Sequence, residues 1–279
     1  MRKNNLVGSC LASAIVLGYF DGAGAREAPA QPECTRASLP AYSHNDYANA
    51  QPLMHALSTG YSGVEVDVFL VDGELRVGHD RPRAAVSGTL EGLYLAPLAA
   101  LVARCGRLTS LHSRPFLLAL EIKEQSQLSH DSVVRLLERY DFLPDIRWGQ
   151  ENAPIEVIMV GWYPTAPASS VTRHAPVKRQ RRISGYGDTL VTDPQGRVGL
   201  ISIDYGKTIG RRWRSAAGRR RWLRTLAAAK RNAGGRALRV HNVPVDSSVY
   251  VDLLAAGVDL IGTKQLSSTR QILLSLAHR

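Results

Sequence analysis

Short apolar runs and helix-like amphipathic runs alternate along most of the chain after residue 38. Apolar and β-branched runs predict strands at 39–43, 63–70, 74–78, 116–122, 155–160, 198–203, 237–241 and 260–262. Periodic runs that begin or end at Pro, Asp or Gly predict helices at 52–58, 96–104, 132–139, 222–232, 249–256 and 269–277. Asp72-Gly73 lies between the second and third predicted strands and indicates a hairpin.

This order of elements predicts an α/β fold. Strands that alternate with helices favour a parallel sheet with crossover helices, and roughly eight such repeats favour a closed TIM-type (β/α)8 barrel. A doubly wound open sheet is the alternative, but the chain has no Gly-rich phosphate-binding fingerprint to favour it. The pattern does not place a fifth barrel strand within 173–190.

The first 25 residues have the pattern of a signal peptide. Arg2 and Lys3 precede a mostly apolar run at 6–20, and Ala23-Gly24-Ala25 offers a small-residue cleavage site. A membrane anchor is disfavoured because a bilayer span needs about 20 apolar residues. We therefore expect an exported (secreted or periplasmic) protein, with a cleaved signal peptide at 1–25, a flexible leader at 26–37 and a barrel domain at 38–279.

Export would leave two cysteines in the mature chain, because Cys10 would be removed with the signal peptide. An even pair in an oxidising compartment favours a disulfide between Cys34 and Cys105. Two free buried thiols are the alternative, and the sequence leaves both open.

The second predicted strand carries two acids where a structural strand needs none. Side chains alternate along a strand, so Glu65 and Asp67 share one face while Val64 and Val66 occupy the other. Burying two carboxylates on one face is costly unless a cation or a proton lies between them. This pattern indicates a functional site.

Further polar residues fall at the carboxyl ends of neighbouring strands, where barrel active sites form. His44 follows the first strand and His79 follows the hairpin, while Glu121 and Lys123 share one face of the strand near 116–122. We expect Glu121 to join the two acids of the second strand in the barrel mouth.

Three converging carboxylates suit one hard divalent cation, Mg²⁺ or Ca²⁺, whereas zinc would favour imidazole or thiolate ligands. Two histidines beside such a cation can act as general base and general acid. A cation and a lysine together suit an anionic substrate. The residues therefore indicate metal-assisted cleavage of a phosphate ester.

Several motifs in order resemble the glycerophosphodiester phosphodiesterase and phosphatidylinositol-phospholipase-C-like superfamily. They are SHNDY at 43–47, EVD at 65–67, VDGELRVGHD at 71–80, GTLEGLYLAPL at 88–98, EIK at 121–123, LRVHNVP at 238–244 and LLAAGVDLIGTKQL at 253–266. They look most like the branch typified by altered inheritance of mitochondria protein 6, and the likeness spans nearly all of 41–270.

The resemblance implies a TIM-type barrel that cleaves a glycerophosphodiester or a phospholipid-derived phosphodiester. It implies a catalytic pair, His44 and His79, and a divalent cation on Glu65, Asp67 and Glu121. Substrate contacts would come from Lys123 and from the residue after the first histidine.

The chain departs from this family pattern at three positions. Asn45 replaces the usual arginine, so the phosphate site has one guanidinium fewer. His241 stands where the branch tends to have tryptophan, and Lys264 where an aspartate is common. Two alternatives therefore stay open, namely metal-free phospholipase-C-type cleavage by the same histidines and a non-catalytic phosphate- or lipid-binding protein.

The positive charge of the chain is concentrated in one segment. Residues 173–231 contain 16 Lys or Arg against 3 acids, whereas the whole chain has a net charge of +11. Arginines interleaved with tryptophans favour contact with an anionic membrane surface, and an exported chain makes nucleic acid the less favoured partner. A solvated basic surface is the simpler alternative.

Overall fold

The computed structural model describes residues 34, 39–110, 115–140, 153–162, 178–182, 198–210 and 214–277. All of them lie in one compact unit, Pro32–Arg279. The expected signal peptide, and the expected leader apart from Cys34, lie outside the described residues. Within this part of the chain, none of the helices has the length and apolar character needed to span a bilayer.

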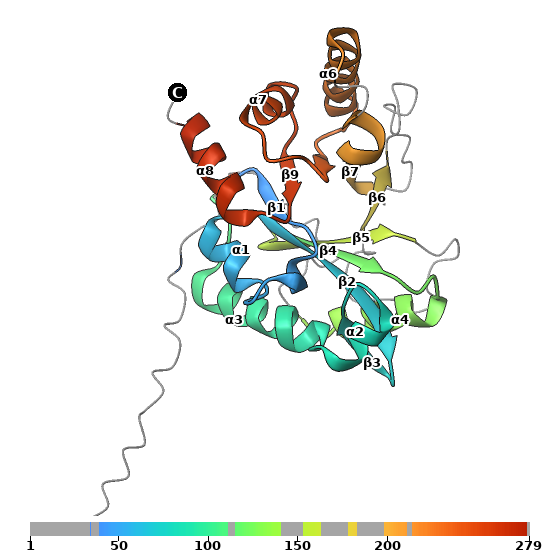
Figure 1. Cartoon of the computed structure of the whole chain (residues 1–279). Helices are drawn as coiled ribbons and strands as arrows, with labels where there is room; N and C mark the ends of the chain where they lie inside the picture. Colours follow the sequence, from blue (N-terminus) through green and yellow to red (C-terminus); the bar gives the residue numbers. More distant parts are fainter. Residues whose placement is uncertain are drawn as a thin grey trace, which may run out of the picture. The chain divides into compact units, whose positions relative to one another are not determined.

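The described strands form a closed parallel barrel (Figure 1). The order around the ring is β1 (Ala41–Ser43), β9 (Leu260–Thr263), β8 (Ala237–His241), β7 (Val198–Asp204), β6 (Lys178–Arg182), β5 (Ile155–Gly161), β4 (Phe116–Ile122) and β2 (Gly63–Val71). A parallel pairing of Ser43 with Val64 joins β1 to β2 and closes the ring. The predicted TIM-type barrel is confirmed.

An antiparallel strand, β3 (Glu74–Val77), extends the sheet from the outer half of β2 and forms the predicted hairpin. The turn carries Asp72 and Gly73, both with positive φ, as a tight two-residue hairpin turn requires.

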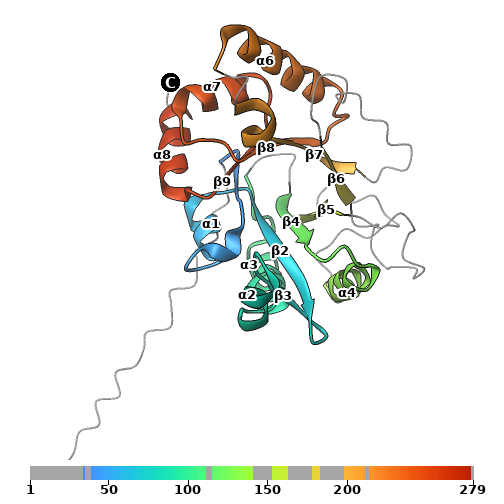
Figure 2. The same ribbon diagram turned by 45° about the vertical axis from the view of Figure 1, so that its right-hand side comes forward.

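Helices follow the strands around the barrel (Figures 1 and 2). They are α1 (Met54–Thr59), α2 (Arg81–Val86), α3 (Ala96–Cys105), α4 (Gln127–Leu137), α6 (Ala216–Arg231), α7 (Ser247–Ala255) and α8 (Leu266–Ala277). In both views α6, α7 and α8 lie on the side of the barrel that carries β7 and β9, whereas α2 and α4 lie on the side that carries β2 and β3.

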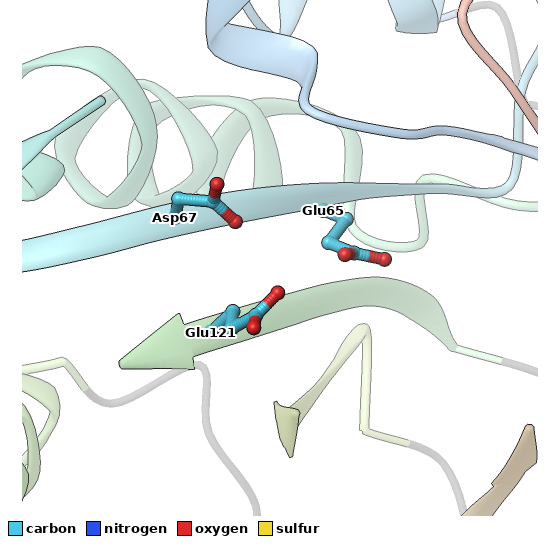
Figure 3. A group of neighbouring side chains, drawn as sticks. All are labelled: Glu65, Asp67 and Glu121. Carbon is cyan, nitrogen blue, oxygen red and sulfur yellow. The ribbon is translucent and has the colours of Figure 1, made fainter. Parts of the chain in front are cut away.

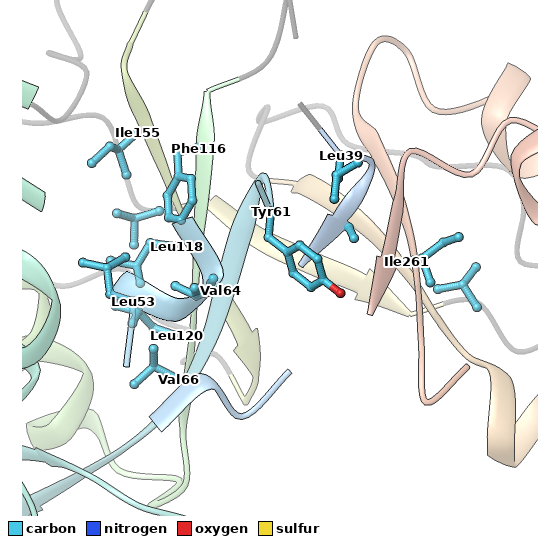
Figure 4. Packing of buried hydrophobic residues seen from close by; sticks show 14 of the residues in the cluster. Leu39, Leu53, Tyr61, Val64, Val66, Phe116, Leu118, Leu120, Ile155 and Ile261 are labelled. Carbon is cyan, nitrogen blue, oxygen red and sulfur yellow. The ribbon is translucent and has the colours of Figure 1, made fainter. Parts of the chain in front are cut away.

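Two apolar layers stabilise the barrel, one on each face of the strands. Val64 and Val66 of β2 pack with Leu118 and Leu120 of β4 in the layer between strands and helices (Figure 4). A smaller cluster, which includes Leu117 and residues of β5, β7 and β9, forms a second layer. Because successive strand residues alternate between these faces, Glu65 and Asp67 point away from the first layer.

Four helices begin earlier than the sequence predicts, and the differences are largest for α4 and α6. The predicted start of α4 after Asp131 is wrong, because the Ser126 hydroxyl accepts the Ser129 N–H and begins this helix at Gln127. Likewise, α6 begins at Ala216, where the Ser215 hydroxyl accepts the Gly218 N–H. Serine caps stabilise helix starts by satisfying such free N–H groups.

The fifth barrel strand, which the pattern did not place, is β6. Its sequence, KRQRR, is wholly polar, so it lacks the apolar run by which buried strands are recognised.

Cys34 and Cys105 form a disulfide. It links the segment before the barrel to Cys105, the last residue of α3. Of the two alternatives that the sequence leaves open, a disulfide or two free thiols, the structure contains the disulfide.

Trp222 of α6 is buried, with 3% of its surface exposed, and packs in the core. This tryptophan is therefore a core residue, and the predicted membrane contact of segment 173–231 stays a prediction that would depend on other residues of the segment. The exposed residues of the same helix include Arg220, Arg221 and Arg224. Trp213 lies outside the described residues.

Candidate active site

Three carboxylates from β2 and β4 converge at one point (Figure 3). The parallel register places Asp67 opposite Glu121, with Glu65 two residues earlier on the same face of β2. Glu65, Asp67 and Glu121 each offer an oxygen atom, and these atoms all lie within 4.8 Å of one another. The structure thus brings together the three acids predicted as metal ligands.

The two predicted catalytic histidines flank this cluster. His44 Nε2 lies 3.6 Å from Glu65 Oε1, and His79 Nδ1 lies 3.2 Å from Asp67 Oδ2. Tyr47 adds a hydroxyl that donates to the same Asp67 oxygen at 2.7 Å.

The environments of the two histidines differ. The His44 side chain is 13% exposed, whereas that of His79 is 58% exposed. Burial lowers the pKa of His44, an effect that Glu65 opposes and Lys264 reinforces. His44 is therefore neutral at neutral pH and can accept a proton.

Lys123 and Asn45, the predicted substrate contacts, lie at the edges of the cluster. Lys123 Nζ is 3.5 Å from Asp67 Oδ2 and 3.5 Å from Glu121 Oε1. Asn45 has a left-handed backbone with φ 53° and lines the cavity that His44 and His79 also line.

Asp46 holds the loop that carries His44 and Asn45. Its buried carboxylate accepts the Leu53 N–H at 2.5 Å and the Tyr94 hydroxyl at 3.1 Å. This carboxylate is a structural anchor rather than a member of the acidic cluster.

Arg239 of β8 is a member of the site that the sequence did not reveal. Its side chain is 1% exposed, and its Nη1 lies 2.6 Å from Glu65 Oε2. Its Nε donates to Ser202 Oγ at 3.1 Å, and its guanidinium carbon lies 4.8 Å from the centre of the Tyr42 ring. An apolar-polar alternation in ALRVH was the available signal, because it places Arg239 on the barrel's inner face with His241.

The pKa values of Glu65 and Glu121 are shifted in opposite directions by their surroundings. Burial acts to raise the pKa of Glu65, but the charge of Arg239, with help from His44 and His241, holds that pKa below its usual value. Burial raises the pKa of Glu121, which Lys123 opposes and Asp67 reinforces. A further cation among these carboxylates would keep all three ionised.

The donor set fits a hard divalent cation. All three ligand atoms are carboxylate oxygens, which Mg²⁺ and Ca²⁺ prefer. In addition, Asp67 Oδ1 is buried and has no hydrogen-bond partner within the described chain. A buried carboxylate oxygen without a partner is costly, and a cation bound there would remove that cost.

Two cavities have His44 among their lining residues. The first, about 690 Å³ in volume, is lined by His44, Asn45, Tyr47 and His79. The second, about 770 Å³ in volume, is lined by His44, Lys264 and residues from the starts of α6 and α7. His44 and Lys264 line both, so a substrate that contacts His44 can extend in two directions.

Residues 34–133 match the family model of the AIM6-like phosphodiesterase domain. This segment is therefore similar to the AIM6-like phosphodiesterase family. The segment contains every site residue predicted from the sequence, from His44 to Lys123, and the predicted resemblance is confirmed. The match supports a phosphodiester hydrolase at the level of reaction class.

Two curated relatives of this segment come from fungi. "Altered inheritance of mitochondria protein 6 homolog" of Arthroderma benhamiae is 39% identical over 66 residues, which cover 22% of this chain and 21% of the relative. "Altered inheritance of mitochondria protein 6" of Lachancea thermotolerans is 32% identical over 148 residues, which cover 45% of this chain and 34% of the relative. The chain thus spans between about a fifth and a third of the length of these relatives.

Two solved structures resemble this chain distantly. A glycerophosphodiester phosphodiesterase from Agrobacterium tumefaciens is 14% identical, with a TM-score of 0.46 and coverage of 85% of this chain and 100% of its own. A β-methylaspartase from Clostridium tetanomorphum is 10% identical, with a TM-score of 0.47 and coverage of 89% of this chain and 59% of its own. Neither likeness carries an argument about function, and the assignment of the barrel rests on its own strand pairing.

Proposed function

We propose that this chain is an exported phosphodiesterase in which His44 and His79 transfer protons. Glu65, Asp67 and Glu121 would hold one divalent cation, Mg²⁺ or Ca²⁺, and Lys123 and Asn45 would contact the substrate. The substrate would be a glycerophosphodiester or another phospholipid-derived phosphodiester. The observation that carries the proposal is the convergence of three carboxylates between two imidazoles, both of which line one cavity.

The charges of the site balance for this reaction. Glu65, Asp67 and Glu121 against Lys123 and Arg239 leave a net charge of −1. A divalent cation changes this to +1, and a phosphodiester monoanion then brings it to zero. When bound, the cation would neutralise phosphate oxygens as charge develops on them.

The histidines can divide the two proton transfers. His44 is neutral at neutral pH and can take the proton of the attacking hydroxyl, either of water or of the substrate itself. As an imidazolium, His79 would donate its Nδ1–H as a hydrogen bond to Asp67 Oδ2 at 3.2 Å and give its Nε2 proton to the leaving alcohol. Lys123, which lies beside both Asp67 and Glu121, would hold a phosphate oxygen.

The disulfide supports the export part of the proposal, because structural disulfides persist in oxidising compartments. N-terminal sequencing of the mature protein from its native host tests it: export predicts a start near residue 26, and an intact Met1 would contradict it.

Lys123 favours one alternative, metal-free cleavage, because its ammonium lies 3.5 Å from two of the three acids. In that case Lys123 would replace the cation, and removal of metal would not affect the rate. A non-catalytic phosphate-binding protein would bind the same diesters without turning them over.

Hydrolysis of a small panel tests the proposal and separates these alternatives. The panel is glycerophosphocholine, lysophosphatidylcholine, phosphatidylinositol and bis-p-nitrophenyl phosphate, each with and without a chelator. We expect turnover that the chelator abolishes and added Mg²⁺ or Ca²⁺ restores. His44→Ala should lower the rate by at least about 100-fold, since general acid–base catalysis contributes about 10²–10⁴-fold.

His55→Ala is the matched control, because His55 belongs to α1 and lines neither cavity. A rate that survives the chelator would favour the metal-free alternative. No turnover of any diester by the wild-type protein would refute the proposed function.

A further inference from the structure

The second cavity differs from the first in its charge. It is lined by Lys264, Arg214 and Arg219, with Asp246 as the acidic residue among the lining groups. The cavity lies among β9 and the starts of α6 and α7, which Figures 1 and 2 place together around β7–β9.

Several of these charges are already paired. Arg219 forms an ion pair with Asp252. Asp246 accepts the N–H groups of Ser248 and Val249 and caps α7. For Lys264 and Arg214, by contrast, the described residues include no acidic group within ion-pair distance. The cavity therefore presents two cations that the described chain leaves available to a ligand.

The backbone fixes Lys264 beside a catalytic residue. Ser43 pairs with Thr263 between β1 and β9, and the His44 N–H donates to the Thr263 carbonyl at 2.8 Å. Lys264 follows Thr263 directly and, like His44, lines both cavities. An exposed lysine alone is weak evidence for a binding site. Lys264, however, lines both the cavity of the proposed active site and the second cavity.

A phosphodiester has two alcohol arms, which leave the phosphorus in different directions. His44 and His79 both line the first cavity, whereas His44 lines the second without His79. A phosphorus atom between the two imidazoles would therefore direct one arm past His44 toward Lys264 and Arg214.

We propose that the second cavity is a subsite for an anionic group on one alcohol arm of the substrate. It would select phosphodiesters that carry a second negative charge, either a carboxylate or a phosphate, in addition to the scissile diester. This inference rests on the proposed phosphodiesterase activity and adds the class of substrate to it.

Two matched diesters test the subsite. Both carry a p-nitrophenyl leaving group, and the second alcohol is n-propanol in one and 3-hydroxypropanoate in the other, so they differ by one carboxylate. The measured quantity is the ratio of kcat/KM for the carboxylate diester to kcat/KM for the neutral diester. We expect a ratio of about ten or more in the wild type, the size of one charge-assisted contact.

Lys264→Gln and Arg214→Gln should each lower this ratio, and the double variant should bring it close to one. Arg220→Gln is the matched control: Arg220 is exposed on α6, lies outside both cavities and changes the net charge equally. We expect its ratio to equal that of the wild type. A third diester, made with 3-phosphopropanol, compares phosphate with carboxylate at the same subsite.

The outcomes separate the subsite from the catalytic proposal. If Lys264 contacts the scissile phosphate instead, Lys264→Gln slows both diesters equally, the ratio stays unchanged and the subsite is refuted. A wild-type ratio near one also overturns it while leaving the phosphodiesterase intact. No hydrolysis of any diester would refute the proposed function and, with it, this inference.

Discussion

Replacement of Arg239 by methionine removes the cation that balances Glu65 inside the barrel. The pair is almost fully buried, with 1% of the arginine side chain and 4% of the glutamate side chain exposed. Methionine retains much of the apolar volume but makes neither the 2.6 Å contact to Glu65 nor the 3.1 Å contact to Ser202. The variant therefore contains a buried carboxylate without its strongest partner.

The expected cost follows from this burial. Removing one member of a buried ion pair typically lowers the free energy of unfolding by about 3–5 kcal/mol, because the remaining charge is uncompensated. We expect a loss in that range at neutral pH.

The loss should depend on pH. In the wild type the pKa of Glu65 is held below its usual value, so the pair contributes stability above about pH 4.3, the usual glutamate value, and loses it as pH falls through the folded pKa. In the variant, burial raises the pKa of Glu65 and the carboxyl takes up a proton. The difference between the two proteins should therefore shrink as pH falls toward about 4.

Urea unfolding followed by circular dichroism measures these differences. The double variant Arg239→Met/Glu65→Gln removes the unpaired charge and should recover roughly half of the loss or more. Arg221→Met is the control, since Arg221 is exposed on α6 and should change stability by less than about 0.5 kcal/mol. A single-variant loss below about 1 kcal/mol, or a double variant less stable than Arg239→Met, would refute this account of the ion pair.

Three further predictions concern other parts of the molecule. Reduction of the Cys34–Cys105 disulfide should lower the free energy of unfolding by about 2–5 kcal/mol; equal urea midpoints with and without a reductant would contradict this. Burial and the charge of Arg239 lower the pKa of His241 to about 4, whereas an unfolded histidine titrates near about 6.5. The unfolded chain therefore binds a proton that the folded chain excludes, so stability should fall as pH drops from about 6.5 toward about 4, and His241→Asn should show a smaller fall in thermal midpoint; equal falls would count against it. Finally, vesicles with anionic lipid should co-sediment with the protein through the exposed arginines of α6, and Arg220→Gln/Arg221→Gln should weaken this binding; equal binding to neutral vesicles would argue against an electrostatic surface.

The sequence was sufficient for the barrel and for the acidic cluster because both depend on strict periodicity. Alternation along β2 places Glu65 and Asp67 on one face, and the parallel register then brings Glu121 beside them. The alternation of side chains between the two faces of a strand is a local property, so it can be predicted from the sequence alone.

What the sequence could not provide depends on contacts between distant segments. Arg239 lies 174 residues from Glu65 along the chain, and a strand position alone does not distinguish a buried cation from an exposed one. The polar strand β6 was missed because its residues lack the apolar pattern. The burial of Trp222 was not predicted either. The many arginines of α6 dominate its composition, although one face of the helix is apolar and packs against the core.

The most direct test of the central claim is the position of a bound cation. Crystals of the protein soaked with Mn²⁺, a substitute for Mg²⁺ that scatters anomalously, should show one anomalous peak at about 2.0–2.4 Å from oxygens of Glu65, Asp67 and Glu121. The peak should vanish in Asp67→Asn crystals, together with the metal-dependent hydrolysis of bis-p-nitrophenyl phosphate. A peak elsewhere in the wild type, or full metal-dependent activity in Asp67→Asn, would contradict the account.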